Sequence, residues 1–208
     1  MNGTLDVSGT SQFNAAVTLA GTTPTLTIGD AGAEDAKIVF DGNAQDFHIG
    51  LDDTADDLVI GLGSALGTTT HMSFDETGAI LKPLQPAFLG VSASQSNVTG
   101  DNTDYTVTFG GTDVFDLNAD FDGTTFTAPV TGRYLFTVCI NVRDTDTDHS
   151  HLFCWLAASN RSAYMAGFNA INYHVTYGDN YELYFSGSAI LDMDASDTVT
   201  VLLDVRGG

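Results

Sequence analysis

Hydrophobic and polar positions alternate with a period of two along most of this chain, which is the pattern of half-buried β-strands. The longest such run covers residues 133–142, and its inward-facing positions are Tyr134, Phe136, Val138, Ile140 and Val142. Pro129 and Gly132 precede the run and predict a turn, because proline cannot continue a central ladder and glycine supplies turn conformations. We therefore predict a long strand that is buried on one face.

The pattern changes near two prolines. Pro83 and Pro86 cannot both lie in a continuous helix or central strand, so we place a domain boundary between residues 82 and 86. The part after this boundary contains longer alternating runs than the part before it. The expected strands are 87–93, 105–109, 114–117, 133–142, 151–158, 173–177, 181–191 and 198–205. Eight strands joined by short turns predict an antiparallel sandwich over residues 86–208.

Residues 1–82 contain only short alternating runs separated by Gly, Asp and Thr. They also show a loose recurrence, with Ile-Gly at 28–29, 49–50 and 60–61 and Phe-Asp at 40–41 and 74–75. None of these runs can bury a core alone, so each exposes a hydrophobic face that neighbours must cover. Trimerisation around an axis would cover these faces and predicts a fibrous β segment, whereas an ordinary small β domain is the alternative.

The composition is that of a folded, strongly acidic β protein. The 208 residues are 43% hydrophobic, which is enough for a packed core. Six basic residues against 27 acidic ones give a net charge of −21, and this balance argues against binding to the phosphates of a nucleic acid. Only three acidic residues are Glu, and because Asp favours turns we expect almost no helix.

The sequence predicts neither a signal peptide nor membrane insertion, because no stretch of 18 apolar residues occurs and no basic segment opens the chain. The only cysteines are Cys139 and Cys154, in two expected strands on either side of residues 143–150. A hairpin centred in that segment would set the two thiols opposite each other. We expect free buried thiols, since two cysteines in a large domain are not a disulfide framework, and a disulfide is the alternative.

The segment 143–150 is also the best candidate for a metal site. Its three aspartates, Asp144, Asp146 and Asp148, alternate along the chain and could converge on a hard cation such as Ca²⁺. The segment lacks the glycine and the glutamate that complete the helix-loop-helix calcium motif, so a solvated acidic turn is the competing interpretation. No cofactor is required by the sequence, and Ca²⁺ is the only one that it leaves open.

Aromatic side chains in the second half are candidates for ligand binding. Trp155, Tyr164, Tyr173 and Tyr177 offer large faces that can stack on sugar rings or contact a protein, although each could instead belong to the core or to a subunit interface. We find no serine nucleophile elbow, phosphate-binding loop or Cys/His catalytic signature. The many aspartates define no glycosidase pair either. We therefore predict that the protein is not an enzyme.

Two stretches resemble the stalk repeats of bacteriophage tail fibres. They are Gly3-Thr-Leu-Asp-Val-Ser-Gly9-Thr, and Lys37-Ile-Val-Phe-Asp-Gly-Asn43 followed by Ile49-Gly-Leu-Asp52. The resemblance extends over most of residues 1–80 and is sharpest at 37–62. Such stalks are homotrimeric, so the resemblance implies a self-associating chain that is joined to upstream fibre or baseplate parts of a virion.

Residues 86–205 resemble the globular head of complement component one subcomponent q, whose jelly roll is shared with the tumour necrosis factor superfamily. The main motif consists of Phe126, Pro129, Gly132, Tyr134 and Phe136. Two segments further along the chain also match the family pattern, Ser186-Gly-Ser-Ala-Ile-Leu191 and Asp197-Thr-Val199. Such heads form tight homotrimers and usually recognise ligands. The family normally ends in a strand with an aromatic-Ser-Gly-aromatic motif, whereas this sequence stops at Gly208. Either residues 184–187 replace that strand, or it is lost.

Together these observations predict an all-β fold, with a trimeric fibrous β stalk over residues 1–82 and an antiparallel jelly-roll β-sandwich head over residues 86–208. The expected function is that of a homotrimeric phage tail-fibre tip. It would face outward on the virion after assembly in the host cytoplasm, and its head would attach to a host cell-surface glycan or protein. The alternative is a structural head that trimerises a virion fibre and binds no ligand of its own.

Overall fold

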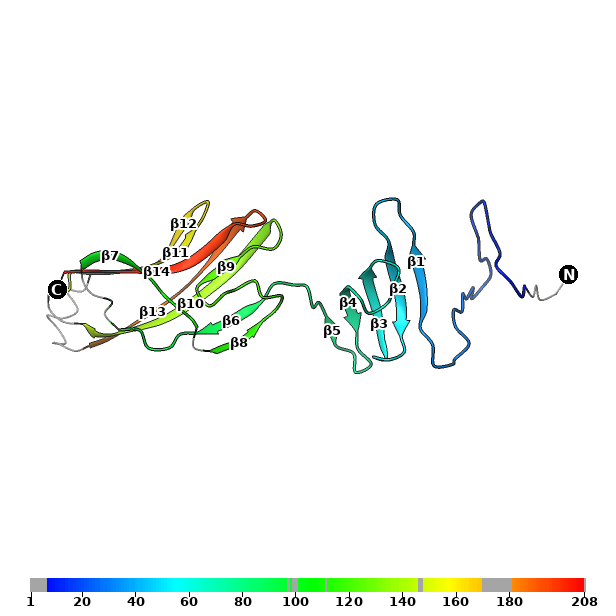
Figure 1. Ribbon diagram of the computed structural model, residues 1–208, viewed down its shortest axis with the longest axis horizontal. Helices are drawn as coiled ribbons and strands as arrows, with labels where there is room; N and C mark the ends of the chain where they lie inside the picture. Colours follow the sequence, from blue (N-terminus) through cyan, green and yellow to red (C-terminus); the bar gives the residue numbers. More distant parts are fainter. Residues whose placement is uncertain are drawn as a thin grey trace. The chain divides into compact units, whose positions relative to one another are not determined.

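The computed structural model describes residues 7–96, 98, 101–110, 112–145, 148–169 and 181–207. This part of the chain is built from antiparallel β-strands and contains no helix, so the prediction of an all-β protein is confirmed. In the same residues, no helix is long and apolar enough to cross a membrane. The chain divides into two compact units, Met1–Pro83 and Leu84–Gly208, which Figure 1 shows in blue to cyan and in green to red.

The first unit is a meander of five antiparallel strands. Along the chain and across the sheet they follow the order β1 (Ala36–Phe40), β2 (Phe47–Asp52), β3 (Asp57–Leu62), β4 (Thr70–Phe74) and β5 (Ile80–Leu81). Asp75 stabilises the turn before β5, because its carboxylate accepts a hydrogen bond from the Thr77 amide at 2.6 Å. Gly78 in the same turn adopts a left-handed φ of 92°. Residues 7–35 form no strand, and every one of them is exposed.

The second unit has two layers. The strands of the first layer follow the order β12 (Ser162–Asn169), β11 (His151–Ala158), β14 (Thr198–Arg206) and β7 (Asp101–Thr106), and β9 (Thr125–Thr127) also pairs with β14. The other layer consists of two pairs, β10 (Gly132–Thr145) with β13 (Tyr181–Met193) and β6 (Phe88–Val91) with β8 (Thr112–Asp116). Alternate side chains from both layers meet in one core.

The inward face predicted for residues 133–142 is confirmed. Phe136 and Val138 are buried, and Tyr134, Ile140 and Val142 pack against the same core from the partly buried positions of β10. Phenylalanine rings dominate this end of the core: the Phe88 ring stacks on Phe121 at 4.4 Å between ring centroids and on Phe126 at 5.3 Å. The period-two pattern therefore identified the correct face of the strand.

The predicted hairpin between the two cysteines is wrong. β10 pairs with β13 in one layer, while β11 pairs with β12 and β14 in the other, so β10 and β11 do not form a hairpin. Both thiols are free, which excludes the disulfide alternative, but Cys139 is exposed and only Cys154 is buried as expected. Burial raises the pKa of the Cys154 thiol to about 11.

Other strand predictions differ in detail. β9 and β12 were not expected, and the expected strand at 173–177 lies outside the described residues. Residues 184–187 lie within β13, opposite the second half of β10, so they do not form a separate closing strand.

Asp197 links the turn at residues 194–197 to the turn at residues 159–160 by hydrogen bonds. Its carboxylate accepts hydrogen bonds from the Asp194 amide at 2.9 Å, the Ser159 hydroxyl at 2.8 Å and the Asn160 side-chain amide at 2.6 Å. The Asp194 amide and then the Ser159 hydroxyl hold the pKa of Asp197 below its ordinary value of 3.8, because they stabilise the charged form.

We expect Asp197→Ala to lower the thermal unfolding midpoint at pH 7 and to flatten its acid dependence. A group whose folded pKa is depressed stabilises the fold above its unfolded pKa, and this contribution disappears as the pH falls through the folded value. The difference between the two proteins should therefore shrink below about pH 4. Melting curves from pH 7 to pH 2 test this, and a constant difference over that range would contradict it.

Candidate functional site: an open groove and an uncovered sheet face

Of the four aromatic residues that the sequence suggests for ligand binding, the structure describes only the side chain of Trp155, and this side chain is buried. Trp155 lies in β11 and is only 9% exposed, because Leu202 of β14 lies directly opposite it in the sheet. Tyr164 is its neighbour on the other side, in β12, and the side chain of Tyr164 is outside the description. Tyr173 and Tyr177 also lie outside the described residues. Trp155 therefore belongs to the packed sheet.

The described residues do not assemble the calcium site. Asp144 is exposed near the end of β10, with a left-handed φ of 57°, and Asp148 is exposed after the break in the description. Asp146 lies outside the described residues. Within the described part of the chain, no three His, Cys, Asp or Glu side chains are grouped to hold a metal ion. Calcium binding by this segment stays a prediction.

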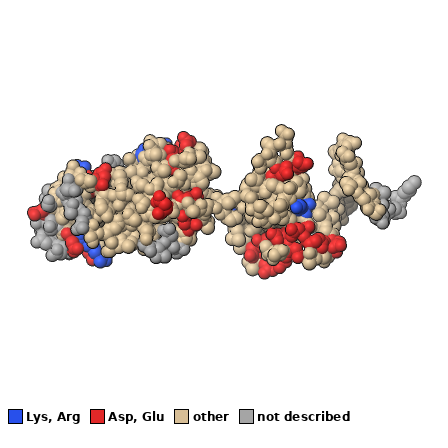
Figure 2. All heavy atoms as spheres, in the orientation of Figure 1, with Lys and Arg blue, Asp and Glu red and all other residues tan. Residues whose placement is uncertain are grey.

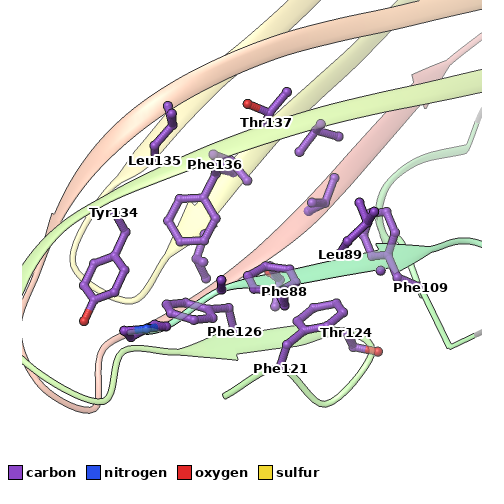
Figure 3. Close-up of a pocket in the computed structure, with 18 of the residues that line it drawn as sticks. Phe88, Leu89, Phe109, Phe121, Thr124, Phe126, Tyr134, Leu135, Phe136 and Thr137 are labelled. Atoms are coloured by element: carbon purple, nitrogen blue, oxygen red, sulfur yellow. The ribbon is translucent and has the colours of Figure 1, made fainter. Parts of the chain in front are cut away.

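A groove opens between β6 and β10. In the described residues β10 pairs only with β13, and β6 pairs with β8 and forms one isolated bridge from Val91 to Gly110, so each strand has one edge without a ladder. A cavity of ≈ 800 Å³ lies between them and is lined by the consecutive residues 132–139 of β10 and by residues 85–90. In Figure 3 the rings of Phe88, Phe121, Phe126 and Phe136 gather in this space. Phe121, Phe126 and Phe136 are buried, and Phe88 is partly buried, so the groove runs along the edge of the aromatic core.

A second cavity extends the groove along β10. It measures ≈ 1230 Å³, is lined by residues 139–144 of β10 and by residues 90–96, and shares Gly90, Phe109 and Cys139 with the first cavity. The two cavities therefore follow the open edge of β10 from residue 132 to residue 144. Of the described residues, Arg133 alone brings a charge to the first cavity, whereas Arg143, Asp144 and His149 line the second.

The outer face of the β10–β13 pair carries a polar end and an apolar end. At the polar end Asn141 donates to Glu182 at 3.1 Å, and this amide, followed by the Tyr184 hydroxyl, lowers the pKa of the Glu182 carboxyl. At the other end Leu135 and Ile190 lie directly opposite each other and are 68% and 67% exposed. Such a pair leaves an apolar patch open to a partner.

The first unit has a larger uncovered surface, which we call the stalk sheet face. The register of the five strands places its side chains in three rows on one side of the sheet. Eight large apolar side chains of this face are 37–58% exposed. They are Ile38, Phe40, Phe47, Ile49, Leu51, Leu58, Phe74 and Ile80.

The middle of the opposite face of this sheet is covered by the chain itself. Residues 63–69 fold over it, with the Leu62 amide donating to the Thr69 carbonyl at 3.0 Å and an imidazole hydrogen bond of 2.8 Å between His48 and the Gly63 carbonyl. His48 is completely buried there, and a side chain in place of Gly61 would clash with its ring. On this face Val39 and Leu81 stay 37% and 51% exposed, whereas the stalk sheet face has eight such exposed side chains among the described residues.

The charges of the first unit avoid the stalk sheet face. Aspartates occupy the turns at 41–46 and 52–57, and Lys37 points to the covered side, where its ammonium group donates to the Ser64 carbonyl at 2.7 Å. In the view of Figure 2 the acidic side chains of this unit gather in separate groups with uncharged surface between them. The stalk sheet face therefore has the composition of an interior surface.

The part of the chain that the structure describes is all-β and has three uncovered apolar surfaces: the stalk sheet face, the groove, and the patch of Leu135 and Ile190. A scan against protein-family models and a search of curated proteins found no match to this chain. The sequence predicted uncovered hydrophobic faces in residues 1–82, but it gave no sign of the groove, because a groove between β6 and β10 depends on strand pairing across 50 residues.

Proposed function

We propose that this chain is a homotrimeric receptor-binding tip of a phage tail fibre, with a stalk in its first unit and a host-binding head in its second. The observation that carries the proposal is the stalk sheet face. A sheet with one largely apolar, uncovered side gains stability by burying that side, and identical copies provide identical apolar sides.

The size of the stalk sheet face supports a stable interface. The exposed fractions of its eight large side chains amount to roughly 700 Å² of apolar surface, taking about 200 Å² for each side chain. The largest apolar patch on a monomer is typically about 300–600 Å². A standard protein interface buries about 800 Å² per partner. The face is therefore large enough to hold copies of the chain together.

A trimer suits this geometry because three sheets can meet around an axis, with each apolar face contacting two others. The resemblance of residues 37–62 to trimeric fibre stalks points to the same number of copies. In the second unit, Leu135 and Ile190 form another uncovered apolar patch that copies could share. Three heads would then present the same surfaces, so that weak contacts to a host glycan or protein multiply through effective concentration.

Adsorption to cells tests the proposal. The fluorescently labelled protein is mixed with a panel of bacterial species, and the fraction that sediments with the cells is measured. A matched variant, Ile49→Asp, should be monomeric with an intact head. We expect the trimer to adsorb to at least one species on the order of 10² times more tightly than the variant. Equal adsorption by both proteins would contradict avidity, and adsorption by neither would favour the structural head.

A further inference from the structure

We propose that the groove along β10 accepts one additional β-strand, supplied by another polypeptide chain. The site is distinct from the stalk sheet face, and the inference does not depend on the trimer or on host attachment. It rests on the backbone edges, the size, the apolar lining and the charge of the groove.

The open backbone edges on both walls of the groove can be hydrogen-bonded by a β-strand. Among the described residues, β10 has one unpaired edge over residues 132–139, and β6 has another over residues 88–90 on the opposite wall of the same cavity. Unpaired backbone groups at a strand edge are templates for pairing with another chain. A strand between β6 and β10 would join the two separate pairs into one layer of five strands. That layer would match the five strands of the opposite layer, and neither a lipid nor a sugar could satisfy both edges.

The dimensions fit a single strand. In a sandwich a strand takes about 4.8 Å across the pairing direction, about 10 Å between sheets and about 3.3 Å along its length, or roughly 160 Å³ per residue. The first cavity, at ≈ 800 Å³, therefore holds about five residues. The second, at ≈ 1230 Å³, holds about eight more. Together they match the stretch 132–144 of β10, which lines both cavities.

The lining of the groove specifies the side chains of the added strand. Rings of Phe88, Phe126 and Phe136 line its inner side, so every second residue of the strand should be apolar. On the rim, Leu89 and Leu135 are 48% and 68% exposed and would gain cover from the strand. Such a strand would complete the core at the end where the phenylalanine rings now border open space (Figure 3).

The charge of Arg133 indicates which kind of residue the added strand carries at one end. Arg133 is one of six basic residues in a chain of net charge −21, yet among the described residues no other charged side chain lines the first cavity. A partner strand should therefore carry an acidic residue near Arg133. We infer a partner with an extended segment that alternates apolar and polar residues and has an acidic end.

Hydrogen exchange of the complete chain tests this inference. The probe is a synthetic nine-residue peptide, Asp-Thr-Val-Thr-Val-Thr-Val-Thr-Asp, and the control peptide replaces the central valine by proline, which cannot pair on both sides. We expect the probe to slow amide exchange in residues 88–91 and 132–139 at least tenfold, and to leave β1–β5 unchanged. The proline peptide should have no effect on either segment.

Cys139 gives a second readout at the middle of the groove. Its thiol is exposed, whereas Cys154 is buried with a raised pKa and serves as an unreactive internal reference. A probe whose central cysteine is supplied as a mixed disulfide with a small thiol should exchange with the Cys139 thiolate, which forms the probe–Cys139 disulfide and releases the small thiol. Neighbouring strands bring such side chains within reach, and Cys139→Ser should abolish the product.

Three results would overturn the inference. One is unchanged exchange in both segments together with no disulfide to Cys139. Another is equal protection by the probe and the proline peptide, which would indicate unspecific apolar binding. The third is protection of both segments that rises with protein concentration without any peptide, because a second copy of the chain would then fill the groove. None of these results bears on whether the stalk sheet face forms a trimer.

Discussion

Aspartate in place of Ile49 is expected to leave the chain monomeric. Ile49 lies in the middle row of the stalk sheet face, between Ile38 and Ile60 on the neighbouring strands, and is 38% exposed. A carboxylate there would have to be buried without a partner when copies meet. The effective penalty for such an ion is several kcal/mol, so association should weaken by more than about 10²-fold.

Val39→Asp is the matched control for Ile49→Asp. Val39 lies in β1 with a similar exposure of 37%, but its side chain lies on the opposite side of the sheet, the side of His48. Sedimentation velocity should show a trimer for the control and a monomer for Ile49→Asp. If both variants stay trimeric, the stalk sheet face is not the interface. If both become monomeric, the effect belongs to the added charge and not to the face.

The second large effect is expected for Phe126→Ala. Phe126 is 2% exposed, and its ring lies 5.3 Å from the ring of Tyr134 and 5.4 Å from that of Phe136, measured between centroids. Removing a buried phenylalanine ring costs about 3–5 kcal/mol, because the transfer energy is lost and a cavity remains. Urea unfolding of the second unit should show this loss as a lower midpoint with an unchanged slope.

Leu135→Ala provides the control for Phe126→Ala. It removes an apolar side chain from the same region, but from the exposed outer face of β10, so the free energy of unfolding should change by no more than about 0.5 kcal/mol. The comparison is made at a protein concentration low enough for monomers. A loss for Phe126→Ala as small as that for Leu135→Ala would contradict the packing described for this core.

The sequence predicted faces of strands better than their partners. Alternation along residues 133–142 identified the buried side of β10, because side-chain direction is a local property of an extended chain. The partner of β10 is β13, some 50 residues away, and the nearby β11 belongs to the other layer. The hairpin between Cys139 and Cys154 was therefore wrong, since sequence proximity does not decide which strands pair.

The candidate site was less predictable than the fold. Trp155 lies on the outer face of its sheet together with His151 and Phe153, yet neighbouring side chains cover it. Exposure of an aromatic residue depends on the strands beside it, which a local pattern does not contain. The groove also depends on which strands lie side by side, because it results from two strands that each form a ladder on one side only. In contrast, the uncovered stalk sheet face was foreseeable, because its short strands have few residues with which to cover one another.

Light scattering of the unmodified chain after size exclusion tests self-association through the stalk sheet face most directly. We predict a mass of three times the 21.9 kDa of one chain. We also expect the trimer to persist upon dilution to the micromolar range, as an interface of this size allows. A monomer of 21.9 kDa at all concentrations would contradict the proposed trimer, because the stalk sheet face would then remain uncovered in water.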